Sequence, residues 1–448
     1  MKALLHFIIT FLIVFHVSAQ ENEPVKHESL SAFLAKGKIS GKTRFYFMAT
    51  DNESTLNDYQ ALAVGTGIAY ATPTFKGFSA GISGFFIVDV FSSDLSVLDP
   101  STENPSRYEL GLFDVTAPEQ KTNLTRLENL FIQYEKKNIK LKYGQFTPKY
   151  LFINPQDGRM SPTMVRGFEG NLKTNKSNLM LAFIHGVSPR STVSWYKVSD
   201  TFGIYPVGRA TDGTAGNYQG NISTPGILLA EWNQKTENGI QLKLGSMSVL
   251  DVFQTWYTNI GLSKNGWNLN AMGIYQHALN GDTNQSYIDS DEKALVFSGQ
   301  ISKDINKWKA SINYSRIADK GRFLMPREWG REPLYTFLPR ERNEGASDVH
   351  AASIKIQNTI SKELNFKLGV GKYWLPDVTD ASKNKYAMPS YTQINLEGNY
   401  AFQGWLKGGT IKTLFVRKIG TEDSYANPKQ VFNKVNMSTL NLIFNYTF

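Results

Sequence analysis

The 448-residue chain contains no cysteine, and this absence limits the kinds of exported protein that it can be. Small secreted domains that lack a large core usually depend on several disulfide bonds, which this chain cannot form. A lipoprotein anchored through an N-terminal cysteine is excluded for the same reason. The chain must therefore fold without covalent cross-links.

Long apolar runs are also scarce, with one exception at the N-terminus. Lys2 precedes the apolar run "ALLHFIITFLIVFHV", and the small residues Val17-Ser18-Ala19 follow it. A basic residue, an apolar stretch and a small-residue cleavage site are the three parts of a secretory signal peptide. We therefore expect residues 1–19 to be removed, which leaves Gln20 or Glu21 as the new N-terminus.

The alternative for this run is a membrane-spanning helix, which needs about 20 predominantly apolar residues. His6, Thr10 and His16 interrupt the run, so the signal peptide is the better interpretation. No later run is long and apolar enough to form such a helix. The mature chain is therefore soluble, or it crosses a membrane in another way.

Blocks of consecutive Lys and Arg are absent although the formal net charge is +9, so nucleic acid is a poor candidate partner. The six histidines show no metal-binding spacing, and "VGTGIAY" lacks the third glycine of a dinucleotide loop. The segment 282–292 has alternating oxygen donors but lacks the central glycine of a calcium loop. We predict no catalytic residue, no metal site and no cofactor.

Alternation of apolar and polar residues is abundant, and it runs to the last residue. In "LNLIFNYTF", Leu440, Leu442, Phe444, Tyr446 and Phe448 share one face of an extended strand. Similar segments of roughly 9–11 residues suit tilted strands that cross a bilayer. The predicted strands are 41–50, 61–72, 77–90, both arms of a hairpin over 128–146, 166–174, 177–187, 225–234, 238–249, 252–263, 265–277, 293–303, 306–316, 348–361, 363–374, 390–401, 407–418 and 435–448. This count of 18 carries an uncertainty of about two strands, so 16 is the alternative.

The connections alternate between short turns and long polar loops, which is typical of outer-membrane barrels. A soluble β-sandwich gives no reason for this alternation, and its loops are rarely so long. The long connections are predicted at 91–123, 148–165, 188–224, 278–292, 317–347, 375–389 and 419–434. Tyr and Trp recur near strand ends, as in the aromatic girdles of such barrels. We predict an all-β fold: residues 20–40 form a periplasmic segment, and 41–448 form a transmembrane antiparallel β-barrel whose last strand pairs with the first.

Three segments resemble one known family, the OprD-type outer-membrane porins. They are "GKISGKTRFYFMATDN" at the first strand, the hairpin "LENLFIQYEKKNIKLKYGQF", and "INPQDGRMSPTMVRGFEGNL" after it. The resemblance implies one barrel of 16 or 18 strands whose third loop folds into the lumen as a constriction. Relatives include selective channels for carboxylated nutrients and the trimeric general porins of epsilonproteobacteria. The terminal aromatic strand, which ends at Phe448, is similar to the signal read by the barrel-assembly machinery.

The segment "QDGRMSPTMVRGF" (156–168) is predicted to be the loop that narrows the pore. Arg159 and Arg166 stay charged at any working pH, and a guanidinium can hold a carboxylate through two hydrogen bonds. In a narrow aqueous pore these side chains would favour anions. The alternative is that Arg159 pairs with Asp157 or Glu169 and only fixes the loop to the wall. The sequence leaves both roles open.

Strand parity also predicts which charged side chains line the pore. The basic candidates are Arg44, Lys140, Lys142, Lys173, Lys243, Lys309, Lys355, Lys367 and Lys412. The acidic candidates are Asp89, Glu135, Glu169, Glu231 and Glu397. An excess of nine over five predicts a positive lumen with a modest preference for anions. Arg44, Lys140 and Lys142 are the wall residues that we expect near the constriction.

The predicted function is passive diffusion of small hydrophilic solutes and ions, with mild anion preference, through the outer membrane of a Gram-negative bacterium. A substrate-selective channel for small carboxylated nutrients is the alternative. A barrel-shaped lipase and an adhesin are further alternatives, but no sequence motif supports either. The expected partners are outer-membrane lipid and lipopolysaccharide, the barrel-assembly machinery and two further copies of the chain in a homotrimer.

Overall fold

The computed structural model describes residues 29–156, 158–279, 284, 286–421, 424 and 427–448. The chain divides into two units, Met1–Gly37 and Lys38–Phe448. The first contains the short helix α2 (Leu30–Ala35), and its N-cap Ser29 accepts a hydrogen bond from the N–H of Ala32 at 3.2 Å. The predicted signal peptide lies outside the described residues. None of the described helices has the length and apolar character needed to span a membrane.

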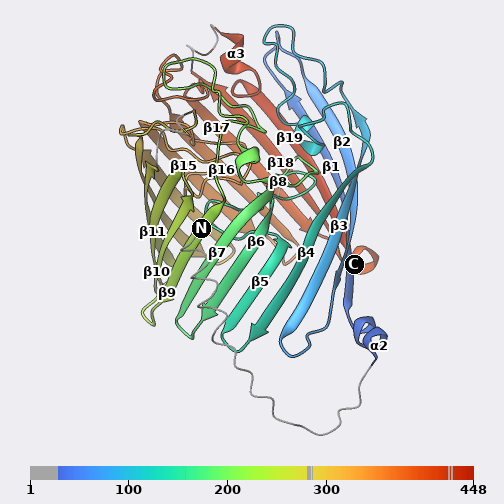
Figure 1. Cartoon of the computed structure of the whole chain (residues 1–448). Helices are drawn as coiled ribbons and strands as arrows, with labels where there is room; N and C mark the ends of the chain where they lie inside the picture. The colour runs from blue at the N-terminus through green and yellow to red at the C-terminus, as the bar shows by residue number, and fades with distance from the viewer. Residues whose placement is uncertain (1–28, 157, 280–283, 285, 422–423, 425–426) are drawn as a thin grey trace. The chain divides into compact units, whose positions relative to one another are not determined.

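The second unit is built from strands joined in chain order into one sheet (Figure 1). The first nine strands are β1 (Lys38–Asp51), β2 (Tyr59–Ala71), β3 (Phe78–Ser92), β4 (Leu124–Lys136), β5 (Ile139–Phe146), β6 (Met164–Lys173), β7 (Ser177–Ser188), β8 (Tyr196–Lys197) and β9 (Ile227–Lys235). The next ten are β10 (Ile240–Val249), β11 (Phe253–Lys264), β12 (Trp267–Ala278), β13 (Lys293–Ile305), β14 (Trp308–Ile317), β15 (Val349–Thr359), β16 (Leu364–Trp374), β17 (Tyr391–Ala401), β18 (Gly409–Gly420) and β19 (Met437–Thr447). Short helical turns are η1 (Leu110–Leu112), η2 (Ser199–Thr201), η3 (Gly404–Leu406) and α3 (Pro428–Val431).

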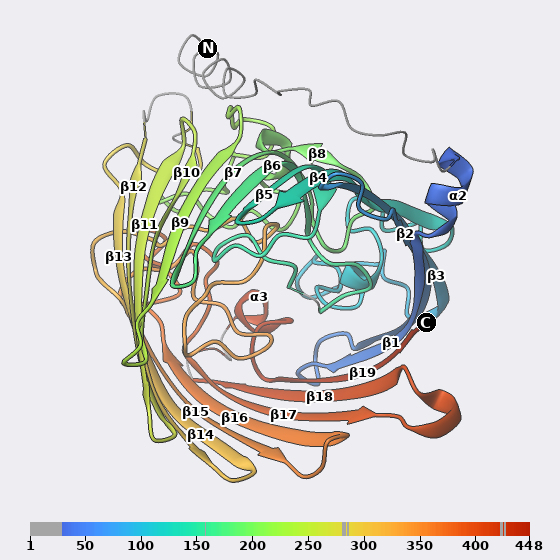
Figure 2. The same ribbon diagram turned by 90° about the horizontal axis from the view of Figure 1, so that it is seen from below.

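The sheet closes on itself, because β1 pairs antiparallel with both β2 and β19 (Figure 2). Phe45 of β1 lies opposite Phe444 of β19 in this seam. The two-residue strand β8 pairs only with Gly186 and Val187 at the end of β7. These residues lie beyond Ile184, the last β7 residue that pairs with β9. Eighteen strands therefore form the barrel and β8 is additional, which confirms the predicted 18 rather than 16.

The strands alternate between an apolar outside and a polar inside, as β14 illustrates. Trp308, Ile312 and Tyr314 are exposed on the outside, whereas Ser311 and Asn313 are buried toward the lumen. Exposed apolar side chains recur in this way around the barrel, and soluble proteins rarely expose so large an apolar surface to water. Lipid covers the outer wall, as expected for a band about 25 Å tall in a transmembrane barrel.

Short turns and long loops lie at opposite ends of the barrel. Asn265 and Gly266 form the two-residue turn between β11 and β12, and both have positive φ angles, of 50° and 74°. Such a type I′ turn matches the twist of the two strands, and Gly supplies the positive φ at no steric cost. The long loops are L2 (93–123), L3 (147–163), L4 (189–226), L6 (279–292), L7 (318–348), L8 (375–390) and L9 (421–436). In outer-membrane barrels the short turns are periplasmic and the longer loops are extracellular.

The loops fold inward and fill the extracellular half of the lumen with packed aromatic side chains. Phe152 of L3 meets Tyr257 of β11 edge to face, with ring centroids 5.4 Å apart. Phe202 of L4 meets Trp329 of L7 in the same way at 5.2 Å. These residues belong to one buried cluster, so the loops pack together as a core inside the barrel. The predicted inward fold of the third loop is confirmed.

The closing seam contains a fitted contact between Gly41 of β1 and the C-terminal Phe448. The N–H of Gly41 donates to the carbonyl of Phe448 at 2.8 Å, and the N–H of Phe448 donates back to Gly41 at 3.1 Å. A Cβ atom on Gly41 would lie only 2.2 Å from the Phe448 ring. The absence of a side chain at position 41 therefore makes room for the last residue.

We expect Gly41→Val to push the Phe448 ring out of this seam and to lower the free energy of unfolding by about 1–3 kcal/mol, as overpacking commonly does. Ala49→Val places the same side chain on the same face of β1, away from Phe448, and serves as the control. The unfolding temperature of the refolded barrel, followed by its heat-dependent shift in gel mobility, measures the difference. Equal unfolding temperatures for the two variants would contradict the fitted contact.

Candidate solute-selecting site

Loop L3 folds inward from β5 and contacts β1, which is separated from β5 in the wall by three strands. The carbonyl of Arg159 accepts a hydrogen bond from Arg44 Nη1 of β1 at 2.6 Å. The carbonyl of Gly158 accepts one from Tyr46 Oη, also of β1, at 3.2 Å. At its other end, the N–H of Asn154 donates to the carbonyl of Trp329 in L7 at 3.0 Å. L3 is thus held between β1 and L7, which reduces the open cross-section of the pore.

The Arg159 side chain is buried in this loop and is 4 % exposed. Its Nη1 donates to the carbonyl of Gly158 at 2.7 Å, and no described carboxylate forms an ion pair with it. Burial lowers the pKa of Arg159 well below its usual value, and the nearby charges of Arg340 and Arg190 lower it further. Arg159 therefore belongs to a group of arginines, in contrast to the expected alternative in which it pairs with Glu169. The other expected partner, Asp157, lies outside the described residues.

Glu169, Lys140 and Lys142 lie on neighbouring strands below L3. Glu169 accepts a hydrogen bond from Tyr150 Oη at 2.7 Å, which fixes the start of L3 to the wall. Lys140 pairs with Glu135 at 3.3 Å, and the Lys142 amine lies 4.6 Å from the centre of the Phe131 ring. The structure brings Arg44 to L3, but it leaves Lys140 and Lys142 with partners on the wall. A role for these two lysines in solute passage stays a prediction.

Other lysines of the lumen wall are also compensated by carboxylates. Lys367 and Lys412 both contact Glu397, at 3.0 and 2.7 Å. Lys243 contacts Glu231 at 3.1 Å. Part of the positive charge predicted for the wall is therefore neutralised where it was expected.

The structure places Arg166 away from the predicted pore constriction. β6 begins at Met164, so Arg166 is a strand residue, as in the predicted strand 166–174, and lies outside L3. It has the parity of Phe168, which is exposed on the outer wall, and its guanidinium lies 4.9 Å from the centre of the Trp195 ring. The indole N–H of Trp195 donates to the carbonyl of Leu127, another residue with an exposed side chain. The structure does not bring Arg166 together with Arg159.

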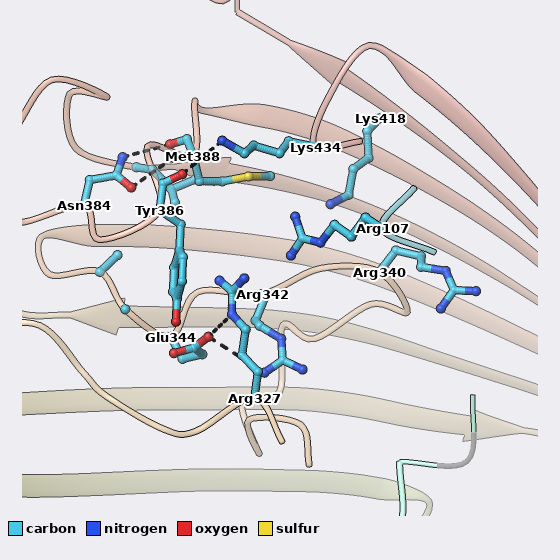
Figure 3. Close-up of a pocket in the computed structure, with 13 residues that line it drawn as sticks. Arg107, Arg327, Arg340, Arg342, Glu344, Asn384, Tyr386, Met388, Lys418 and Lys434 are labelled. Carbon is cyan, nitrogen blue, oxygen red and sulfur yellow. Dashed lines mark hydrogen bonds and ion pairs between the residues drawn. The ribbon is translucent and has the colours of Figure 1, made fainter. Parts of the chain in front are cut away.

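A larger group of cations gathers inside the barrel above L3, and the sequence analysis missed it. Six basic side chains and one carboxylate, Glu344, line a small cavity there (Figure 3). The six are Arg107, Arg327, Arg340, Arg342, Lys418 and Lys434, which we call the basic cluster. Glu344 forms an ion pair with Arg327 and lies 3.8 Å from Arg342. Basic side chains outnumber carboxylates six to one among the residues that line this cavity, so its lining has a net positive charge.

No local sequence pattern marks the basic cluster, because its members come from four separate parts of the chain. Arg107 is on L2, Lys418 is on β18 and Lys434 is on L9, while L7 supplies the three other arginines. The "PRER" segment at 339–342 is the densest local signal, and it holds two of the six, separated by one residue. Only the inward folding of the loops assembles the group.

Several groups in these loops titrate close to neutral pH because they are buried. Burial lowers the pKa of Lys434 to about 7, and the charges of Arg107 and Arg327 contribute. Burial lowers the pKa of Lys385 to about 7 as well. Burial raises the pKa of Glu328 to about 7. A rise in pH through 7 therefore removes positive charge at two of these sites and adds negative charge at the third.

We predict that anion preference falls as the pH rises through neutrality, because all three titrations make the lumen less positive. The reversal potential across a salt gradient, measured at about pH 6 and about pH 8, gives the ion preference. Lys434→Met removes one titrating group and should make the pH dependence smaller. A preference that is constant, or that rises with pH, would contradict this electrostatic assignment.

The sequence matches no family model and no curated protein. Solved structures share the fold over most of the chain. OccK9 (OpdG) of Pseudomonas aeruginosa has a TM-score of 0.72 and 14 % identity, covering 93 % of this chain and 99 % of that one. OccAB2 of Acinetobacter baumannii has a TM-score of 0.71 and 13 % identity, covering 93 % and 98 %. OpdK of Pseudomonas aeruginosa, solved with vanillate, has a TM-score of 0.68 and 14 % identity, covering 93 % and 99 %.

The likeness covers most of each chain, at an identity that establishes the fold alone. Among the described residues, no group of three or more His, Asp or Glu side chains is arranged to hold a metal ion. The closed 18-stranded wall with its apolar outer face and polar lumen is a transmembrane architecture. The chain has the fold of the OprD-type outer-membrane porins, and its location is the outer membrane of a Gram-negative bacterium.

Proposed function

We propose that the chain is a passive channel for small hydrophilic solutes and ions, and that it prefers anions. The observation that carries this proposal is the basic cluster, in which six cations and one carboxylate line a cavity within the lumen. Rings of like charge in a narrow aqueous passage attract counter-ions and repel ions of their own sign. A low-dielectric wall strengthens this effect by focusing the field. Solved structures with this fold are outer-membrane channels, which supports a channel rather than an enzyme.

A selective channel for small carboxylated solutes is the second candidate, and the narrowness of the site favours it. The cavity among the basic residues has a volume of about 30 Å³, room for only about one to three water molecules. Four of the six cations are arginines, which bind a carboxylate through two parallel hydrogen bonds. The Arg327 guanidinium lies 3.3 Å from the centre of the Tyr386 ring, so an aromatic side chain borders the cavity beside the cations. Vanillate, present in one solved neighbour, is a carboxylate of this kind.

Swelling of liposomes that contain the purified protein tests the proposal and separates the two candidates. A general channel admits neutral sugars and carboxylates of equal size at rates that differ by a small factor. A selective channel admits the carboxylate much faster, and an added carboxylate blocks its single-channel current. Failure of every small solute to enter, in vesicles that hold correctly folded barrels, would contradict both candidates.

Three further expectations remain part of this proposal. The strand β19, which ends next to Phe448, is proposed to be read by the barrel-assembly machinery, and three copies of the chain are proposed to form a trimer. No residue is assigned a catalytic role. Crosslinking of the protein in outer-membrane preparations, followed by mass measurement, tests the trimer.

A further inference from the structure

Six basic side chains form a row on the outside of the barrel, close to the extracellular loops. They are His277 on β12, Lys293 on β13, Arg316 on β14, His350 on β15, Lys372 on β16 and Arg417 on β18, which we call the outer basic row. These strands are consecutive neighbours in the sheet, with β17 between the last two (Figure 2). All six residues lie within four positions of the strand end that joins an extracellular loop.

The alternation of each strand shows that these side chains point away from the lumen. On β13, Lys293 has the parity of Leu295, Phe297 and Ile301, which are exposed, while Val296 between them is buried. On β16, Lys372 has the parity of the exposed Trp374, and on β18 Arg417 has the parity of the exposed Ile419. The row therefore faces the lipid and not the channel.

Position along the strand explains why the barrel can carry these cations. A charged side chain on the lipid face strongly destabilises a barrel at the middle of the bilayer, but has little effect on its stability near the membrane surface. Below the row, the outward positions of β12 to β18 hold no Asp or Glu and are mainly Leu, Ile, Phe, Ala and Gly. Tyr275, Tyr314 and Trp374 lie beside the row and mark the boundary between lipid and water.

Two direct cross-strand pairs bring basic residues together within this row. His277 lies opposite Lys293, and Arg316 lies opposite His350. Cβ atoms of such pairs are about 4.5–5.5 Å apart, so a single anionic group at this surface can contact both members of a pair.

Protein groups contact some members of the outer basic row and, among the described residues, leave others without a polar partner. Arg316 pairs with Asp348 at 2.5 Å, and Arg417 donates to Ser438 Oγ at 3.0 Å. Tyr314 Oη lies 2.6 Å from His350 Nδ1. Within the described part of the chain, Lys293 and Lys372 have neither an ion pair nor a hydrogen bond from their amines, although the exposed Asp291 is two residues from Lys293.

We propose that the outer basic row binds the phosphate groups of the phosphorylated glycolipid in the outer leaflet. Phosphate oxygens accept charge-assisted hydrogen bonds from Lys, Arg and His, and the row lies at the depth of the lipid head groups. The strands below it offer an apolar surface to the acyl chains of the same lipid. The inference depends on the location and orientation of the barrel and is independent of what passes through its lumen.

Native mass spectrometry of the mature protein, released from detergent with added lipid A, tests the proposal. The test variant carries Lys293→Gln, Lys372→Gln and Arg417→Gln. Each change removes a charge-assisted contact with phosphate, so the three changes together should reduce retained lipid A by roughly tenfold or more. The control is Lys303→Gln, which removes an outward lysine of β13 at the periplasmic end, where its amine lies 4.9 Å from the centre of the Trp267 ring.

A second measurement needs no variant and so does not depend on folding of the mutant. The unmodified protein should retain lipid A much better than the same lipid after enzymatic removal of its phosphates. Phosphatidylglycerol, which has one phosphate and no sugar backbone, shows whether any anionic lipid suffices. Equal retention of phosphorylated and dephosphorylated lipid A, or equal retention by the test variant and the Lys303→Gln control, would overturn the proposal.

Discussion

Arg107→Gln combined with Lys418→Gln is expected to remove most of the anion preference of the channel. Both side chains line the cavity of the basic cluster, and no described carboxylate forms an ion pair with either. Two unit charges 4 Å apart interact by about 1 kcal/mol in water and by about 4 kcal/mol near a protein surface. Removal of two such charges should lower the ratio of chloride to potassium permeability by roughly tenfold or more.

The matched control removes two lysines from the periplasmic end of the barrel. Lys303 and Lys307 donate to the carbonyls of Asn265 and Ile360 beside the short turns, far from L7. Lys303→Gln combined with Lys307→Gln changes the net charge equally and should leave the permeability ratio within about twofold of the unmodified channel. Equal effects of the two double variants would show that total charge, and not the basic cluster, sets the ion preference.

Glu292→Gln is expected to loosen the packing of the extracellular loops. Glu292 of L6 accepts hydrogen bonds from the backbone N–H of Arg322 at 2.8 Å and from its Nε at 3.2 Å. Arg322 of L7 also donates to the carbonyl of Arg209 in L4 at 3.1 Å. Both charged side chains are buried, so the substitution leaves an uncompensated cation in the interior, which costs about 3–5 kcal/mol.

Protease cleavage of the loops in intact liposomes, together with the unfolding temperature, measures this effect. Glu237→Gln is the control, because it breaks the exposed pair of Lys176 and Glu237, and exposed pairs contribute about 0–1 kcal/mol. Arg322→Met added to Glu292→Gln should restore part of the stability, since no unpaired charge then remains buried. Similar cleavage of the Glu292→Gln and Glu237→Gln variants would contradict the structural role of the buried pair.

The wall of the barrel was predictable because its physical signal is local. An apolar side chain at every second residue requires one face in lipid and one in water, and this period is visible within ten residues. The pairing of the first and last strands followed from the cost of an unpaired edge in hydrocarbon. The structure confirms the alternation of the wall and the pairing of the first and last strands. Phe45 lies opposite Phe444 in this pairing.

The charge of the lumen was predicted less well, because it depends on contacts between distant residues. Parity showed that Lys367, Glu397 and Lys412 share a side, but not that Glu397 lies between the two lysines. Arg166 was placed correctly at the start of a strand, but the sequence did not show that its side chain has the parity of Phe168 on the outer wall. The basic cluster required knowledge of how four separate segments fold inward, and no spacing in the sequence encodes that.

The reversal potential of single channels across a potassium chloride gradient, in a planar lipid bilayer, tests the central claim most directly. A lumen lined by six cations and one carboxylate predicts a reversal potential displaced toward the equilibrium potential of chloride. Reduction of this displacement when the pH is raised from about 6 to about 8 would agree with the titration of Lys434, Lys385 and Glu328. A reversal potential displaced toward that of potassium, or the absence of any conductance from folded barrels, would contradict it.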